Sequence, residues 1–462
     1  PMPRRILIDP VTRLEGHGRI DIRLDEAGNV SHAFFQVPDF KGFEQFSVGR
    51  AAEEMPTLTQ KICGVCPTAH HIAGTKALDD LFTVTPPLAA RLIRELMHTA
   101  FIFEDHLLHF FYLGGPDILV DGEPAKQSHN VFGAIAAMGD TLGRQVINIR
   151  KKVRAMNAML GGSALYPVCG LAGGVSKPVD AKMRAEIIQT STDALALARQ
   201  LLAVFHDKVR KKPLYREMIG NPAFNLSTYY MGLVDDNDRV NFYDGRLRVV
   251  TPDGRPWACF SADQYLDHLA ERTDVYSYMK LVYLKKVGWN GYQDGPDSGL
   301  YRVGPLARLN AAKAMATPLA QQEYERFYDT IGHKPAHNTM LYHWARLIEV
   351  LYAAEQMVIL SRCQALTDPH VRTLPTQAPT SGVGVCEAPR GTLIHHYQTN
   401  ANAIVERCNL LVATQNNAAA ICLSVEKAAR ALIKNGNVTD SCLQQVEMAY
   451  RAYDPCLACA TH

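Results

Sequence analysis

Two pairs of cysteines have the spacing of metal ligands. Cys63 and Cys66 form one Cys-x-x-Cys pair, Cys456 and Cys459 form the other, and residues 67–455 lie between them. Thiolates are soft ligands that suit zinc, nickel or iron. Because a zinc ribbon usually has its pairs ~15–20 residues apart, pairs at opposite ends of the chain indicate one buried metal clamped by the whole fold. For either pair alone, a redox dithiol is the alternative.

Each pair is expected at the end of a helix. Pro67 suits the first turn of a helix that continues over 69–81. Cys66 then stands at a helix N-terminus, where free amides and the helix dipole favour a thiolate. Pro455 separates the second pair from a preceding helix over 439–453. Neither pair is followed by histidine, so covalent c-type haem is excluded.

Long amphipathic helices must position these pairs. Apolar residues recur mostly at spacings of three and four, and Gly or Pro ends several of the runs. The pattern predicts helices over 87–113, 130–160, 179–211, 336–366 and 398–434, the last interrupted near 414–417. Since none of them can bury its apolar stripe alone, they should form a bundle.

Shorter strands are expected around this bundle. Strands are predicted over 4–8, 18–24 and 30–37, short strands and turns over 227–260, and an irregular Pro/Gly/Thr-rich segment over 372–397. The predicted fold class is mainly α with β decoration (α+β): a central bundle of long helices, an N-terminal β-hairpin region and small peripheral sheets. We expect a single domain over 1–462, with a β-rich part at 1–55, the helical core at 56–215 and 336–462, and an irregular or β insertion at 216–335.

Composition narrows the classes of function. The 462 residues carry 48 Lys+Arg against 46 Asp+Glu, a net charge of +2, and 47% are hydrophobic. These values exclude a disordered chain and give no reason to expect nucleic acid as a partner. The 11 cysteines are too sparse for a disulfide scaffold. We expect no membrane span, because no apolar run is long enough, and a cytoplasmic location, because no signal segment is visible.

Six motifs together resemble the large subunits of nickel–iron hydrogenases. The two cysteine motifs do so with their neighbours, Ile62 and His70 on one side and the run from Asp454 to His462 on the other. The other four motifs are Arg13-Leu14-Glu15-Gly16-His17, Lys41-Gly42-Phe43-Glu44, Asp105-His106 with Gly115-Pro116-Asp117, and Glu387-Ala388-Pro389-Arg390-Gly391-Thr392. Further details resemble the cytosolic, multi-subunit branch. In two departures, Lys61 replaces the usual arginine and Ala413 a frequent proline.

The resemblance implies a catalytic centre of nickel and iron. All four cysteines would bind nickel, Cys63 and Cys456 as terminal ligands, while Cys66 and Cys459 would bridge to an iron that carries carbon monoxide and cyanide. Glu15 would relay protons to and from Cys456. Arg390 would lie over the open metal position, with Asp105 and Asp454 as its partners and Pro389 fixing its backbone. The plainer alternatives are a solvated charge for Glu15 and a structural ion pair for Arg390.

The resemblance also implies supporting residues and a second metal. Magnesium, or iron, would lie near the C-terminus, bound by Glu44, His462 and the carbonyl of Leu410. Thr414 would donate a hydrogen bond to a cyanide. His70 would donate to a cysteine sulfur, with a satisfied core histidine as the alternative.

The implied reaction is reversible heterolytic cleavage of H2 into protons and electrons. The remaining cysteines are scattered singly without iron–sulfur spacing, and no dinucleotide fingerprint is present, so we expect no iron–sulfur cluster or nucleotide in this chain. Electrons would leave through a small subunit with iron–sulfur clusters, and through further electron-transfer subunits. The alternatives are a zinc-stabilised scaffold and a non-catalytic structural subunit; retention of all four cysteines disfavours the latter.

Overall fold

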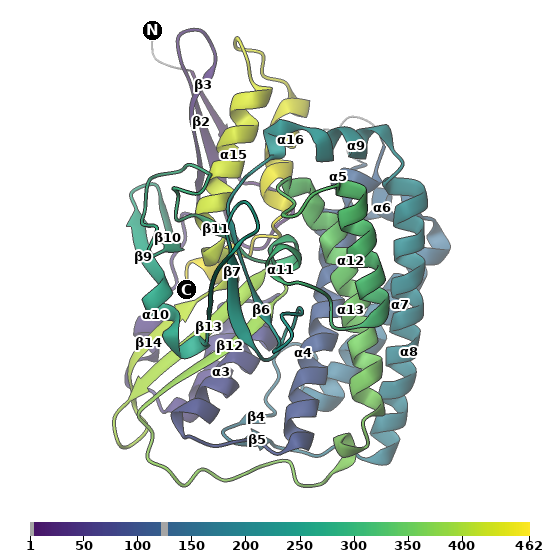
Figure 1. Cartoon of the computed structure of the whole chain (residues 1–462), viewed down its shortest axis with the longest axis vertical. Helices are drawn as coiled ribbons and strands as arrows, with labels where there is room; N and C mark the ends of the chain where they lie inside the picture. The colour runs from purple at the N-terminus through teal and green to yellow at the C-terminus, as the bar shows by residue number, and fades with distance from the viewer. Residues whose placement is uncertain (1–3, 122–127) are drawn as a thin grey trace.

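A computed structural model of the chain, which describes residues 4–121 and 128–462, places long helices side by side in a bundle (Figure 1). Helix α13 is buried almost throughout and contacts three other helices of the bundle. The bundle comprises α4 (Leu88–Leu108), α7 (Asp140–Gly161), α8 (Ala181–Val204), α12 (Pro318–Ile331) and α13 (Tyr342–Arg362). The predicted fold class, mainly α with small sheets, is confirmed.

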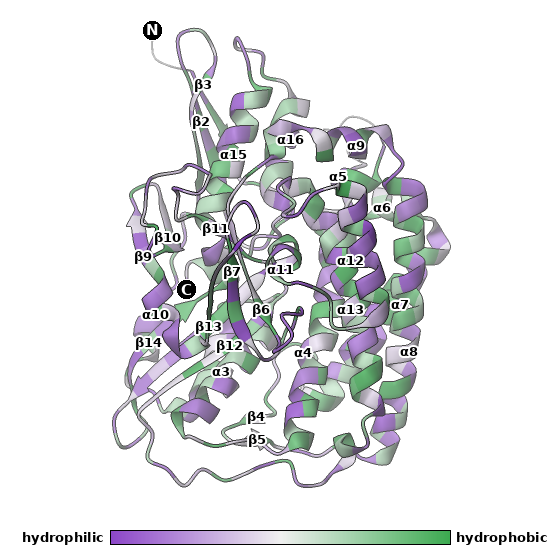
Figure 2. Ribbon diagram, in the orientation of Figure 1, coloured by the Kyte–Doolittle hydropathy of each residue, from purple (hydrophilic) through white to green (hydrophobic). Residues whose placement is uncertain are grey.

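The outer helices of the bundle have one apolar and one polar face (Figure 2). On α7, Leu142, Val146, Ile149 and Val153 are buried, and their spacing of three or four residues places them on one side of the helix. Arg144 on the same helix is exposed. Across the two described segments, no helix is both long enough and apolar enough to cross a membrane.

One predicted helix is divided in two, and two others end in a different kind of helical turn. Gly139, with φ of 101°, divides the helix predicted over 130–160 into α6 (Val131–Met138) and α7, because a positive φ cannot continue an α-helix. The helices predicted over 87–113 and 179–211 each end in one wider turn of π-helix, at His109–Leu113 and Phe205–Val209.

The helix predicted over 398–434 is wrong in its first half. The chain instead forms an antiparallel sheet of β12 (Ser381–Ala388), β13 (Gly391–Thr399) and β14 (Val405–Leu411), and only then α14 (Ala413–Asn416) and α15 (Ala418–Leu432). The sheet also takes up much of the segment predicted to be irregular. Helix α3 (Pro67–Leu81) packs against β12 and β13. This packing decides the outcome, because tertiary contacts override a short apolar pattern.

The smaller sheets follow the prediction more closely. The expected hairpin region is β1 (Arg5–Ile8), β2 (Arg19–Leu24) and β3 (Val30–Gln36), all antiparallel. Residues 227–260 contain β6 (Tyr229–Val234), β7 (Arg246–Val250) and β8 (Pro256–Phe260). Helices α11 (Pro305–Ala311) and α12 lie within 216–335, where only irregular structure and strands were expected.

A buried group of charges joins α11 to α13 and β12. Arg308 donates hydrogen bonds to both carboxylate oxygens of Glu349, at 2.5 and 2.7 Å, and to Glu387 at 2.5 Å. All three side chains are fully enclosed. Arg308 also donates to the carbonyls of Ala388 and Pro389, at 3.0 and 3.1 Å. The buried guanidinium of Arg308 thereby fixes the backbone immediately before Arg390.

Replacing Arg308 by methionine is expected to destabilise the fold by about 3–5 kcal/mol, because Glu349 and Glu387 would keep hydrogen bonds to His106 and Thr392 but lose the guanidinium that balances their buried charges. Chemical denaturation of the purified chain measures the loss. Arg326→Met is the matched control: Arg326 pairs with Glu323 at 3.1 Å but is 56% exposed, so about 0.2–1 kcal/mol is expected. Equal losses in the two variants would contradict this account of Arg308.

Candidate metal centre

The four motif cysteines meet in the interior of the protein. Their Sγ atoms all lie within 4.8 Å of one another, and all four residues are buried. The contacts cross between the two ends of the chain, since the Sγ–Sγ distances from Cys63 to Cys456 and from Cys66 to Cys459 are both 3.2 Å. The arrangement is that of a four-thiolate metal site.

The first pair is positioned by the start of helix α3. Pro67 occupies the first turn of the helix, and Cys66 is the residue just before it. Proline suits this position because the missing N–H would have no partner within the helix. The amides of Val65 and Cys66 donate to the Cys63 sulfur at 3.1 and 3.2 Å. The loop therefore directs both cysteines toward one point.

The second pair opens the short helix α17 (Leu457–Ala460). Cys456 pairs with Glu15 in an isolated parallel bridge, and the Leu457 amide donates to the Glu15 carbonyl at 2.9 Å. Residues 450–462 are all buried. The final segment of the chain is thus fixed against the first motif, which explains how residues so far apart in sequence share one site.

The four thiols differ in how readily they ionise. Burial raises the pKa of Cys456 and Cys459 well above the ordinary thiol value. For Cys63, burial also opposes ionisation, but hydrogen bonds with the other three thiols outweigh it and lower the pKa. Metal binding replaces thiol protons. Four soft donors at one buried point fit zinc, nickel or iron, and no hard cation would prefer them.

A small cavity lies beside the sulfur atoms. Its wall combines one guanidinium, one imidazole and one hydroxyl with aliphatic side chains, so it can hold a small group with a few polar contacts. It is lined by Cys66, His70, Ala388, Arg390, Leu393, Val412, Ala413, Thr414, Cys456 and Cys459.

Arg390 is held in the cavity wall by two carboxylates. Its Nη1 lies 3.2 Å from Oδ2 of Asp105, and its Nη2 lies 3.0 Å from Oδ2 of Asp454. All three are buried. Burial raises the pKa of Asp105 to about 8, although the charge of Arg390 opposes the rise, and it raises the pKa of Asp454 as well. The structure therefore brings together Arg390, Asp105 and Asp454, which the family resemblance had associated.

Glu15 contacts the second cysteine pair and is itself partly exposed to solvent. Its Oε2 accepts from the Cys456 thiol and from the Ala458 amide, both at 3.0 Å. The residue itself is half-buried. Burial, and then the nearby negative charge of Cys63, raises the pKa of its carboxyl. Glu15 is therefore the predicted site residue with both a sulfur contact and partial access to solvent.

Glu44 and His462 lie close together near the C-terminus. His462 Nε2 is 3.5 Å from Glu44 Oε1 and has no hydrogen-bond partner within residues 4–121 and 128–462. Leu410 contacts Glu44 through its amide, at 2.9 Å, and Lys280 donates to Glu44 at 3.0 Å. Although burial opposes it, these three partners lower the pKa of Glu44 to about 2. A carboxylate oxygen 3.5 Å from an imidazole nitrogen that lacks a hydrogen-bond partner in these segments fits a cation between them.

The three remaining predicted residues surround the cysteines. Thr414 lines the cavity, and its hydroxyl oxygen accepts the Cys456 amide at 3.0 Å. His70 Nε2 lies 3.5 Å from the Cys459 sulfur. The carbonyl of Pro389 accepts from Arg308, while its neighbours Ala388 and Arg390 line the cavity.

Sequence reasoning missed several residues that support the site. Arg308, Lys280 and His395 belong to regular helices or strands, where no short motif marks them. The one available signal was Glu387, inside the Arg390 motif, because a glutamate between buried residues needs a cationic partner. Arg308 is that partner.

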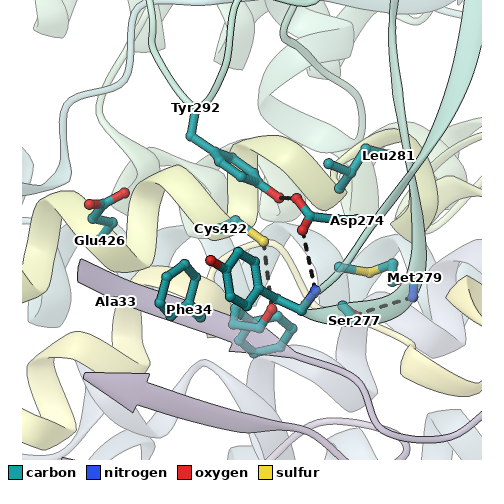
Figure 3. A pocket seen from close by; sticks show the side chains of 11 residues that line it. Ala33, Phe34, Asp274, Ser277, Met279, Leu281, Tyr292, Cys422 and Glu426 are labelled. Atoms are coloured by element: carbon teal, nitrogen blue, oxygen red, sulfur yellow. Dashed lines mark hydrogen bonds between the residues drawn. The ribbon is translucent and has the colours of Figure 1, made fainter. Parts of the chain in front are cut away.

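Seven of the 11 cysteines lie outside the centre. Within the described segments, no second group of three or more His, Cys, Asp or Glu side chains could share a metal ion. Figure 3 shows Cys422 in a pocket with Phe34, Asp274 and Tyr292. Its thiol donates to the Phe35 carbonyl, and burial raises its pKa to about 12. A free cysteine is usually a core residue, but Cys259 is exposed.

Comparisons with known proteins agree with this centre. The sequence model of the family described as nickel-dependent hydrogenase matches residues 41–129 and 248–462, and one described as HoxL-like matches 5–40. An iron-sulfur subunit of the F420-non-reducing hydrogenase of Archaeoglobus profundus is 42% identical over 99% of this chain and 94% of its own length. The NAD-reducing hydrogenase HoxS subunit beta of Cupriavidus necator is 36% identical over 100% and 95%.

Solved structures show the same fold. An NAD+-reducing [NiFe]-hydrogenase in the H2-reduced state superposes with a TM-score of 0.92 at 36% identity, over 100% of both chains. The Ni-Fe-Se hydrogenase from D. vulgaris Hildenborough reaches a TM-score of 0.80 at 21% identity, again over 100% of both, which supports the fold alone. With its four cysteines gathered at one buried point, the chain therefore belongs to the nickel-dependent hydrogenase family as a large subunit, an oxidoreductase that acts on H2.

Proposed function

We propose that the chain holds a nickel–iron centre that carries carbon monoxide and cyanide on its iron. The observation that carries this proposal is the meeting of four buried thiols beside a cavity walled by Arg390. Cys63 and Cys456 would be terminal ligands of nickel. Cys66 and Cys459, whose side chains line the cavity, would bridge to iron. When bound, such a centre supplies the heterolytic cleavage of H2.

The proton route begins at Cys456 and continues through Glu15. The 3.0 Å contact between the Cys456 sulfur and Glu15 Oε2 is short enough for direct proton transfer. The raised pKa of the carboxyl makes its protonation easier, and its partial exposure gives the proton a way out. Glu15 thus takes the proton at one oxygen and releases it toward solvent.

Arg390 orients small groups in the cavity and keeps its charge while doing so. Asp454 accepts a hydrogen bond from its Nη2 at 3.1 Å and Asp105 lies 3.2 Å from its Nη1, so the guanidinium loses little freedom when a ligand arrives. The Thr414 oxygen accepts from the Cys456 amide, and its hydroxyl proton would donate to a cyanide nitrogen.

A hard cation, magnesium or iron, would bind between Glu44 and His462. The orphaned His462 Nε2 and the ionised Glu44 carboxylate support this, and the carbonyl of Leu410 is the proposed third ligand. Since hard cations prefer oxygen and keep bound waters, water would complete the shell. Lys280, 3.0 Å from Glu44, limits the net charge that the site can accept.

Electrons leave the chain through partner subunits. The relatives from Archaeoglobus profundus and Cupriavidus necator are both named as subunits of hydrogenases. In the described part of this chain, the other cysteines form no group that could hold a cluster. We infer that a small subunit with iron–sulfur clusters receives the electrons and passes them to further subunits.

Metal analysis with infrared spectroscopy tests the proposed centre. The purified complex should contain about one nickel per chain together with iron, and it should show carbonyl and cyanide stretching bands; zinc alone, without those bands, would sink the proposal. Cys66→Ala should lose nickel and H2 oxidation together. Cys259→Ala is the matched control, because Cys259 is exposed and does not belong to the group of four cysteines, and it should lose neither.

A further inference from the structure

A chain of three buried side chains leads away from the Cys459 sulfur. His70 Nε2 lies 3.5 Å from that sulfur, His70 Nδ1 lies 3.1 Å from Nε2 of His395, and Nδ1 of His395 lies 2.6 Å from the hydroxyl of Tyr397. His70, His395 and Tyr397 are all fully enclosed. The four groups form one continuous hydrogen-bonded path from the metal centre into the sheet.

The fold builds this path from two elements. His395 and Tyr397 are alternate residues of β13, so their side chains leave the same face of the strand. Helix α3, which carries His70, packs against that strand. Gly74 of α3 lets the Tyr397 hydroxyl approach, because a Cβ there would lie 3.1 Å from the hydroxyl oxygen. His396, between the two, instead contacts Tyr265 and Ser381.

The direction of donation along the path follows from proton counting. Both imidazoles are fully enclosed, and none of their hydrogen-bond partners in the described part of the chain is a carboxylate, so each is neutral and has one N–H. A metal-bound thiolate has no proton and can only accept. If Cys459 accepts from His70 Nε2, then His70 Nδ1 must accept from His395, and His395 Nδ1 must accept from Tyr397.

A competing partner could reverse this order. Tyr397 also interacts with Thr59, whose hydroxyl donates its own proton to the Met55 carbonyl at 2.7 Å. Thr59 can therefore only accept from Tyr397. The single phenolic proton goes either to Thr59 or to His395, and only the second choice presents an N–H to the Cys459 sulfur.

We propose that His395 and Tyr397 are positioning residues that hold His70 as the Nε2–H tautomer, so that it donates a hydrogen bond to the sulfur of Cys459. This inference rests on the proposed role of Cys459 as a bridging thiolate. A hydrogen bond to a metal-bound sulfur withdraws electron density from it, and such bonds tune the metal's electronics. Tyr397, which acts through His395 and His70, thereby tunes the electron density at the sulfur.

Infrared spectra of the intact complex test the inference through two substitutions with different expected outcomes. Tyr397→Phe removes the terminal donor, so the carbonyl and cyanide bands should shift to lower wavenumber as the sulfur gains electron density. Thr59→Val removes the competing acceptor, so the bands should stay in place or move to higher wavenumber. His396→Gln, whose side chain points away from the path, is the control and should not move them.

The outcomes separate this inference from the proposed centre. A wild-type complex without carbonyl and cyanide bands would refute the centre itself. Wild-type bands that stay in place in Tyr397→Phe, with nickel retained, would overturn the tautomer role and leave the centre intact. If Tyr397→Phe does not retain nickel, Thr59→Val decides: bands at or above the wild-type position support the inference, and a downward shift overturns it.

Discussion

Replacing Glu15 by glutamine is expected to slow H2 oxidation by about 10²–10⁴-fold while nickel and iron stay bound. The amide keeps the size of the side chain and can still accept from the Ala458 amide, but it cannot take up a proton from Cys456, whose sulfur lies 3.0 Å away. Activity with an artificial electron acceptor and metal content of the same preparation measure the two parts of the prediction.

Glu26→Gln is the control for Glu15→Gln. This substitution makes the same chemical change at an exposed residue in the turn between β2 and β3, outside both cysteine motifs. It should leave activity unchanged. Normal turnover in Glu15→Gln would remove Glu15 from the proton route. Loss of nickel in that variant would instead assign Glu15 a role in holding the Cys456 segment.

Replacing Arg390 by lysine is expected to lower H2 oxidation by about 10²–10³-fold, the usual cost of one preorganised donor. Lysine keeps the positive charge that Asp105 and Asp454 require, so the fold should survive. It lacks the planar fork that reaches both carboxylates at 3.2 and 3.0 Å while facing the cavity. Turnover and thermal unfolding, compared in one preparation, separate the loss of orientation from a loss of stability.

Arg407→Lys is the matched substitution on the neighbouring strand β14, where the side chain is exposed, and it should change neither quantity. If Arg390→Lys retains full activity, the guanidinium is only a structural ion pair. If it unfolds the protein as readily as Arg308→Met does, the activity loss cannot be assigned to the cavity.

The centre could be predicted from sequence because its chemistry is concentrated in short motifs. Cysteine spacing alone indicates a four-thiolate site, and Pro67 and Pro455 indicate how each pair is presented. The motif around Arg390 and the distant Asp105 and Asp454 could be associated only through the family resemblance. The structure then places them within ion-pair distance.

What sequence reasoning missed depends on packing. Val405–Leu411 lies in a span that was predicted to be helical. It forms a strand because it pairs with β13, and α3 packs against the same sheet. His395 and Tyr397 lie in the segment that was predicted to be irregular but forms strand β13, so the contact of His395 with His70 was not expected. Arg308 and Glu349 are paired across two helices, a relation that periodicity within one helix cannot express.

Because the metal centre needs both cysteine pairs, the first pair must wait during synthesis until the second has been made. Residues 67–455 must be added between the two pairs, which takes about 20–80 s at ordinary rates of translation. Throughout that interval Cys63 and Cys66 are a bare dithiol on an incomplete chain, open to oxidation or to capture of a wrong soft metal. The folded site therefore cannot protect the first pair of thiols until the second pair has been synthesised.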